Sequence, residues 1–385
     1  MRTRSFLALA VAALCTTPLH AQSVPSHVLG KPNAMIAEPF SRVYGATEMR
    51  DGRVIVSDIR DATLTVADFR TGKSAQIGRN GEGPNEYAVP GIALRTPGDS
   101  FYLVDGRNRR FLRLDGNGAL AGTVPFERAL MMGGIGGGDM AADSMGRLYW
   151  ATDFVDMNPT TGPKRALKSH VARWSPGNAA KEIVAEVGDH APELHANKFF
   201  PYAERDGWVV APDGRVGVLS AREYRLRWYE NGKLMLEGPP LAYTPIMITS
   251  AERAAFRNER AAQGPAGGAT ITGGGANDAT RQEAARRSML DVYPDNFFPK
   301  AMPPFVDGGV RRSPGGDIWV ERSRAASDKV RRFDVLTAAG ALRATVQLPE
   351  DTHMVSLQPG GIYLVRTDAD GLQFLGRYTW PGTLR

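Results

Sequence analysis

The chain has 385 residues, 42% of them hydrophobic and 23% charged, so it can bury a substantial core. Its 43 glycines and 26 prolines make turns frequent, which favours many short strands over long helices. The formal net charge of +6 is small for this length, which argues against a nucleic-acid partner.

The first 21 residues predict an export signal. MRTRSFLALAVAALCTTPLHA has two arginines, an apolar run up to Cys15 and small residues ending at Ala21. The run is too short to span a bilayer, and Leu14 stands where a lipoprotein signal has a small residue. Cleavage after Ala21 would leave a mature chain, 22–385, with no cysteine and a charge of +4, because two arginines and no acidic residue are removed. We therefore expect a soluble protein without a transmembrane segment, in the periplasm or outside the cell.

One element then recurs six times: a turn containing glycine, followed by a strand of β-branched or aromatic residues. The copies are DGRVIVSD (51–58), GDSFYLVD (98–105), MGRLYWAT (145–152), DGRVGVLS (213–220), GGDIWVER (315–322) and GGIYLVR (360–366). The first two align closely, since Asp58 and Asp105 are 47 positions apart, as are Arg60 and Arg107. A second strand and a further turn follow each copy, so each unit carries about four strands, as in a propeller blade. The sequence predicts an all-β fold, a six-bladed β-propeller that forms one domain over 22–385.

The segment 241–300 interrupts the repeats between blades four and five, and it predicts a helical insertion. SAERAAFRNERAAQ begins with Ser250, a candidate N-cap, and predicts a helix, and DATRQEAARRSML (278–290) predicts a second helix. The glycine-rich stretch 264–278 between them predicts a flexible linker. Because the last unit ends without a fourth strand, we expect the N-terminal segment 27–40 to supply it and close the ring.

A glycine-rich stretch, IGRNGEGPNEYAVP (77–90), links the first two units. It is not a dinucleotide fingerprint, because Glu86 stands where the third glycine belongs and Pro84 and Pro90 deny it a helix. We interpret it as a turn between blades. The stretch resembles the blade-linking segment of NHL-type propellers, especially of secreted bacterial six-bladed propellers, and FPKAMPPFVDGGVRRSPGGDIWVERS resembles the start of blade five in that group. The matching residues are Gly81, Gly83, Pro84, Glu86, Tyr87 and Pro90, with Asn85 in place of a glycine. The resemblance implies the fold and exported location and does not specify an activity.

The enlarged connections all fall on one face of the predicted ring, which is where we expect binding. The ends of the second strand of each blade point to this face and form a polar rim with the arginines of the following loops. The candidate ligand-binding residues are Asp58, Arg60, Glu82, Glu86, Asp105, Arg107, Arg322 and Arg366. The arginines suit a polar or anionic ligand. The alternative is that Asp58 and Asp105 cap turns and pair with Arg60 and Arg107 in their own loops.

A metal site has weaker support in the sequence. His190 and His195 flank Glu193 in one loop, but their spacing fits no zinc template. We expect no cofactor; if a metal binds, Ca²⁺ held by carboxylates is the candidate. Trp150, Trp228 and Trp319 lie in the strand repeats and are expected in the core.

The function predicted from the sequence is an exported, non-catalytic, monomeric propeller that binds a small polar or anionic ligand, or a protein of the cell envelope. No G-x-S-x-G motif supports a serine hydrolase. The alternative is a metal-dependent propeller hydrolase or lyase resembling lactonases or streptogramin lyases, with His190, His195, Asp58 and Asp105 as acid–base or metal-binding residues.

Overall fold

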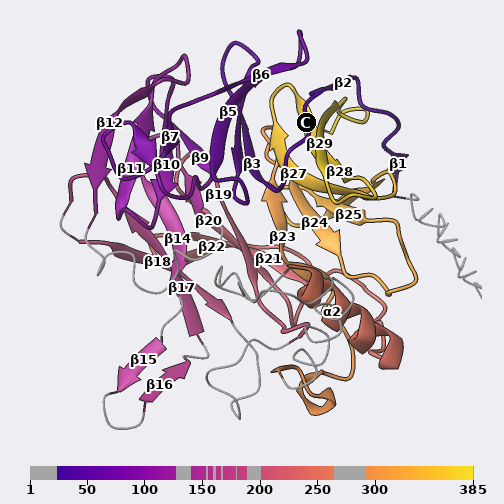
Figure 1. Cartoon of the computed structure of the whole chain (residues 1–385). Helices are drawn as coiled ribbons and strands as arrows, with labels where there is room; N and C mark the ends of the chain where they lie inside the picture. Colours follow the sequence, from indigo (N-terminus) through magenta and orange to yellow (C-terminus); the bar gives the residue numbers. More distant parts are fainter. Residues whose placement is uncertain are drawn as a thin grey trace, which may run out of the picture.

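The computed structural model describes residues 24–126, 140–152, 155–158, 162–165, 168–178, 180–188, 201–263 and 292–384. These residues form six sheets of four or five strands arranged in a ring, which confirms the predicted six-bladed β-propeller (Figure 1). The predicted export signal, the second predicted helix and the whole of the flexible linker lie outside the described residues.

Each blade consists of four strands in chain order, except that the hairpin of β15 (Val155–Asn158) and β16 (Gly162–Arg165) interrupts blade three and the N-terminal segment contributes to blades five and six. Blade one is β3 (Val43–Glu48), β4 (Val54–Asp58), β5 (Thr63–Asp68) and β6 (Lys73–Gln76), and blade two is β9 (Ala93–Thr96), β10 (Ser100–Asp105), β11 (Arg110–Leu114) and β12 (Leu120–Pro125). Blade three is β13 (Met140–Ala142), β14 (Leu148–Thr152), β17 (Lys168–Trp174) and β18 (Glu182–Gly188). Blade four is β19 (Gly207–Val210), β20 (Val216–Ser220), β21 (Arg225–Glu230) and β22 (Lys233–Glu237). Blade five contains β23 (Phe305–Arg312), β24 (Ile318–Arg322), β25 (Arg332–Leu336) and β26 (Leu342–Gln347), and blade six contains β27 (Thr352–Gln358), β28 (Gly361–Thr367) and β29 (Gln373–Tyr378).

The N-terminal segment closes the ring, as predicted. β2 (Ala34–Met35) pairs antiparallel with β29 and becomes the fourth strand of blade six. The main-chain N–H of Ile36 donates to Leu375 O at 3.1 Å, and the Ile36 side chain is fully buried. β1 (Ser26–Val28) adds a fifth, parallel strand to blade five on the outer edge of β26, which the sequence analysis did not anticipate. The same segment therefore ties together two neighbouring blades.

The core lies between the blades. Each of six apolar clusters combines side chains from two adjacent blades, so that every sheet is covered on both faces. All five residues of β4 and of β20 are buried for this reason, although only alternate residues would be buried in a one-sided sheet. Trp150, Trp228 and Trp319 lie in these clusters, which confirms that they are core residues.

The insertion between blades four and five contains a helix, α2 (Ser250–Gln263), and a short 3-10 turn, η2 (Asp295–Phe297). Its two ends run antiparallel as a stem, with Ile248 N–H donating to Lys300 O at 3.0 Å and Met302 N–H to Ile246 O at 2.9 Å. Thr249, and not Ser250 as predicted, caps the helix: its hydroxyl accepts from the Ala251 N–H at 3.2 Å. Glu252 accepts in return from the Thr249 N–H at 3.1 Å.

An aromatic cluster holds α2 against the ring. The ring of Phe256 lies 5.3 Å from that of Tyr202, 5.2 Å from that of Tyr293 and 5.6 Å from that of Phe298. The hairpin β15 (Val155–Asn158) and β16 (Gly162–Arg165), from a connection of blade three, lies on the same side of the ring as α2 (Figure 1). We call this side the insertion face; it carries the connections between the second and third strands of each blade and those between successive blades.

Candidate functional site

The two aspartates that end β4 and β10 are structural anchors of the insertion face. The Asp58 carboxylate accepts hydrogen bonds from the main-chain N–H groups of Ser41 (2.6 Å), Arg42 (3.1 Å), Arg60 (3.0 Å) and Asp61 (3.2 Å). Asp105 has no exposed surface, and it accepts from Ala88 N–H at 3.1 Å, Asn108 Nδ2 at 2.9 Å and Arg110 Nε at 3.0 Å. The described contacts of both carboxylates therefore favour the turn-capping interpretation.

The arginines predicted to pair with Asp58 and Asp105 do not form those ion pairs. Asp105 forms its ion pair with Arg110, on the next strand, and not with Arg107. Asp58 accepts from the main chain of Arg60 and has no ion pair with its guanidinium. The side chains of Arg60 and Arg107 are exposed on the insertion face, so their role in binding stays a prediction.

The glycine-rich stretch between blades one and two holds the carboxylate of its own residue Glu86 by hydrogen bonds. Residues Arg79–Asn80 (β7) and Glu86–Tyr87 (β8) pair in parallel across the loop. Glu86 accepts from Arg79 Nε at 2.6 Å and from Gly83 N–H at 2.8 Å, and these hydrogen bonds, that of Gly83 first, lower the pKa of Glu86. A Cβ atom on Gly81 would lie 2.1 Å from Glu86 Oε2, so glycine is needed there to make room for the carboxylate. Glu82 is exposed beside it.

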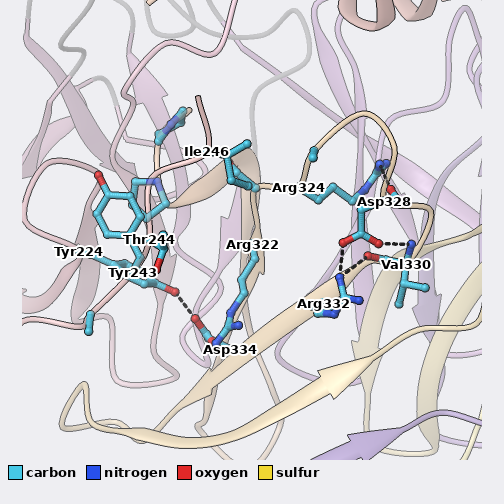
Figure 2. A pocket seen from close by; sticks show the side chains of 15 residues that line it. Tyr224, Tyr243, Thr244, Ile246, Arg322, Arg324, Asp328, Val330, Arg332 and Asp334 are labelled. Carbon is cyan, nitrogen blue, oxygen red and sulfur yellow. Dashed lines mark hydrogen bonds and ion pairs between the residues drawn. The ribbon is translucent and has the colours of Figure 1, made fainter. Parts of the chain in front are cut away.

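A cavity of about 420 Å³ opens on the insertion face between blades four and five (Figure 2). Three separate parts of the chain build it: the turn at Tyr224 in blade four, the loop 323–331 in blade five, and the two ends of the insertion. Its lining residues are Tyr224, Ala242, Tyr243, Thr244, Ile246, Pro303, Pro304, Arg322, Ser323, Arg324, Ala325, Asp328, Val330, Arg332 and Asp334. We call it the interblade pocket.

Main-chain hydrogen bonds hold the walls of the interblade pocket together. Leu241 N–H donates to Tyr224 O at 2.8 Å, and Ser323 N–H donates to Pro304 O at 3.2 Å. Tyr224 has a φ of 46°, and Ala62 and Arg109, which also stand immediately before the third strand of their blades, have φ values of 49° and 53°. The left-handed residue thus belongs to a repeated tight turn, and in blade four it places a tyrosine at the pocket.

One end of the interblade pocket is a hydrogen-bond network around the buried carboxylate of Asp334. The carboxylate accepts from Tyr224 Oη at 2.5 Å and from Arg322 Nε at 2.8 Å. Burial and the adjacent Asp334 charge raise the pKa of Tyr224 well above its ordinary value, so the phenol stays protonated and donates. The hydrogen bond to Asp334 raises the pKa of Arg322. The charges of Arg322 and Asp334 therefore compensate each other.

The other end of the interblade pocket holds two arginines and one carboxylate. Arg332 forms an ion pair with Asp328 and also donates to Val330 O at 3.3 Å. Arg324 Nη1 donates to the main-chain oxygen of Asp328 at 3.0 Å. Among the described residues, Arg324 has no carboxylate oxygen within 4.0 Å. Figure 2 shows the two groups apart, with Tyr224, Arg322 and Asp334 at one end and Arg324, Asp328 and Arg332 at the other.

Of the sequence candidates that lie in the described part of the chain, only Arg322 lines the interblade pocket. Arg366 is exposed on blade six, with its guanidinium 5.2 Å from the centre of the Phe374 ring. The sequence analysis missed Arg324, Asp328 and Arg332. The signal available was their local density in ERSRAASDKVRRFD, a connection longer than those of blades one and two.

The metal candidates His190, Glu193 and His195 lie outside the described residues. Within the described part of the chain, no three histidine, cysteine or acidic side chains gather closely enough to hold a metal ion. No described helix has the length and apolar character needed to cross a membrane.

No protein-family model matches this sequence, and no curated protein matches it. Solved structures with a similar chain path include a streptogramin B lyase, with 10% identity and a TM-score of 0.39, over 90% of this chain and 86% of that one. A calcium-binding protein, regucalcin, from Agrobacterium tumefaciens has 11% identity and a TM-score of 0.39, over 93% and 97%. The PQQ-bound aldose sugar dehydrogenase from Streptomyces coelicolor has 13% identity and a TM-score of 0.40, over 90% and 97%. The assignment of the fold rests on the sheet topology described above.

Proposed function

We propose that this protein is an exported, non-catalytic β-propeller that binds a small polar or anionic ligand in the interblade pocket. The observation that carries the proposal is the pocket itself, because it combines three arginines, two tyrosines and an apolar wall in about 420 Å³. That volume lies within the range of small-molecule sites, which are concave, mostly apolar and carry few polar groups. The insertion supplies part of the wall, which gives the enlarged connection a role in binding.

The two carboxylates offered for acid–base or metal chemistry do not support the hydrolase or lyase alternative. Asp58 accepts four main-chain hydrogen bonds, and Asp105 accepts three hydrogen bonds, from the glycine-rich stretch and from blade two. Each is occupied in holding a turn. The described polar residues of the insertion face therefore fit ligand binding better than hydrolysis.

Thermal unfolding of the purified chain tests the proposal. The ligands to add are acetate, benzoate, phosphate, sulfate and citrate, and separately Ca²⁺, Zn²⁺ and a chelator. We expect at least one anion to raise the melting temperature, since a ligand that binds only the folded state stabilises it. Ala325→Trp, which fills the pocket, should abolish that rise, while Ser327→Trp, on an exposed residue of the same loop that does not line the pocket, should keep it. A rise that survives Ala325→Trp would place the ligand elsewhere, and a rise with Ca²⁺ or Zn²⁺ alone would favour the metal-dependent alternative.

Export is proposed from the N-terminal sequence and from the resemblance to secreted NHL-type propellers. Intact-mass measurement of the protein recovered from the periplasm or the medium should give a chain that starts at Gln22. A full-length chain that remains in the cytoplasm would contradict the proposal.

A further inference from the structure

The charges that line the interblade pocket do not cancel. Arg322 is compensated by Asp334 and Arg332 by Asp328, so two of the three guanidinium groups already have a carboxylate partner. Within the described part of the chain, the hydrogen bond of Arg324 goes to the main-chain oxygen of Asp328 and no carboxylate oxygen lies within 4.0 Å of its guanidinium, although its charge helps to lower the pKa of Asp328. The pocket therefore presents one positive charge more than its own acidic residues balance.

The remainder of the lining is largely apolar. Apolar side chains come from Ile246, Pro303, Pro304, Val330, Ala242 and Ala325, and Thr244 and Ser323 add hydroxyl groups. Tyr243 is half-exposed and lies across from the buried Tyr224, with the two rings 6.0 Å apart at 88°. The apolar part of this lining suits hydrocarbon or an aromatic ring.

We infer that the interblade pocket recognises a small organic acid that carries one carboxylate and an apolar body, with Arg324 binding the carboxylate. This inference rests on the proposed function of the same pocket. A guanidinium matches the geometry of a carboxylate with two parallel N–H donors, and Arg324 keeps donors beyond the one given to Asp328. A single negative charge neutralises the pocket. A second charge on the ligand would be left without a partner in a partly dry site, which is costly.

The test compares ligands of matched shape and different charge. Binding to the full chain is measured by calorimetry at pH 7.5 for acetate, hexanoate and benzoate, for the neutral benzamide, and for the doubly charged phenyl phosphate. We expect hexanoate or benzoate to bind best, with acetate weaker for lack of an apolar body. Benzamide and phenyl phosphate should bind at least tenfold more weakly than benzoate.

Variants assign the effect to Arg324. Arg324→Gln should weaken the binding of benzoate at least tenfold and remove the preference for benzoate over benzamide. Arg324→Lys should keep part of that affinity and preference. Arg222→Gln, on an exposed arginine of the insertion face that pairs with Glu204 and does not line the pocket, is the matched control and should leave binding unchanged. Circular dichroism and the melting temperature confirm that each variant is folded.

Each contrary result overturns a different statement. Equal binding of benzamide and benzoate would refute charge recognition, and tighter binding of phenyl phosphate would refute the single charge. Unchanged benzoate binding by Arg324→Gln would refute the role of that residue. If citrate, phosphate or sulfate stabilises the chain through the pocket while no monocarboxylate binds, this inference fails and the proposed function stands. If no anion stabilises the wild-type chain, both fail.

Discussion

Replacing Asp105 by alanine should destabilise the whole ring rather than remove a ligand contact. The carboxylate is fully buried and binds Ala88 N–H, Asn108 Nδ2 and Arg110 Nε, while the Arg110 side chain is only 14% exposed. Arg110 also donates to Gly83 O and to Glu86 O, at 2.8 Å each. The ion pair therefore links the glycine-rich stretch 77–90 to blade two.

The magnitude follows from what the substitution leaves behind. Removing one partner of a buried ion pair typically costs about 3–5 kcal/mol, because the remaining charge is desolvated and unpaired. Arg110 is partly compensated by its two carbonyl acceptors, so we expect Asp105→Ala to lower the free energy of unfolding by about 3 kcal/mol, at the lower end of that range. An exposed substitution usually changes stability by less than about 0.5 kcal/mol, and this is the expectation for the control, Arg107→Ala.

Denaturant unfolding followed by circular dichroism measures both free energies. Hydrogen exchange should also show faster exchange in residues 79–90 of Asp105→Ala and not of Arg107→Ala. A loss below about 1 kcal/mol for Asp105→Ala, the size of an ordinary single hydrogen bond, would refute the reasoning.

Three further predictions concern closure, acid sensitivity and the glycine-rich stretch. Ile36→Ala should lower the free energy of unfolding by about 2–5 kcal/mol, because this fully buried side chain packs where the N-terminal segment completes the last blade. A loss of less than about 0.5 kcal/mol in denaturant unfolding, the size expected for an exposed residue, would contradict this. Burial, and then the charge of Arg331, lower the pKa of His353 to about 4, so unfolding takes up a proton between pH 6.5 and 4. His353 should not affect the free energy of unfolding above pH 6.5, and below pH 6.5 it should lower that free energy by up to about 3 kcal/mol. If the wild-type chain loses no more stability between pH 7.5 and 4.5 than His353→Gln does, this role of His353 is wrong. Gly81→Ala should cost about 1–3 kcal/mol through the clash with Glu86, and Glu86→Ala in the same chain should recover part of it; strictly additive losses would exclude the clash.

The sequence by itself determined the architecture. The six copies of a glycine turn followed by an apolar strand predict six blades, because a sheet covered on both faces needs strands that are apolar throughout, as β4 and β20 are. The missing fourth strand of the last unit predicted closure by the N-terminal segment, since an unpaired edge is unfavourable, and β2 occupies that position. The helix in the insertion was also evident, from its alanine-, arginine- and glutamate-rich composition.

Only the tertiary structure decided which polar residues share a site. Asp105 and Arg107 stand close together in the sequence, yet the partner of Asp105 is Arg110, because its side chain comes from the adjacent strand and also reaches the glycine-rich stretch. Tyr224 and Asp334 are 110 positions apart and meet in one hydrogen bond, which no local pattern could reveal. The interblade pocket arises where two blades and both ends of an insertion meet. Its chemistry therefore depends on how the blades pack, while the repeat pattern depends only on how each blade is built.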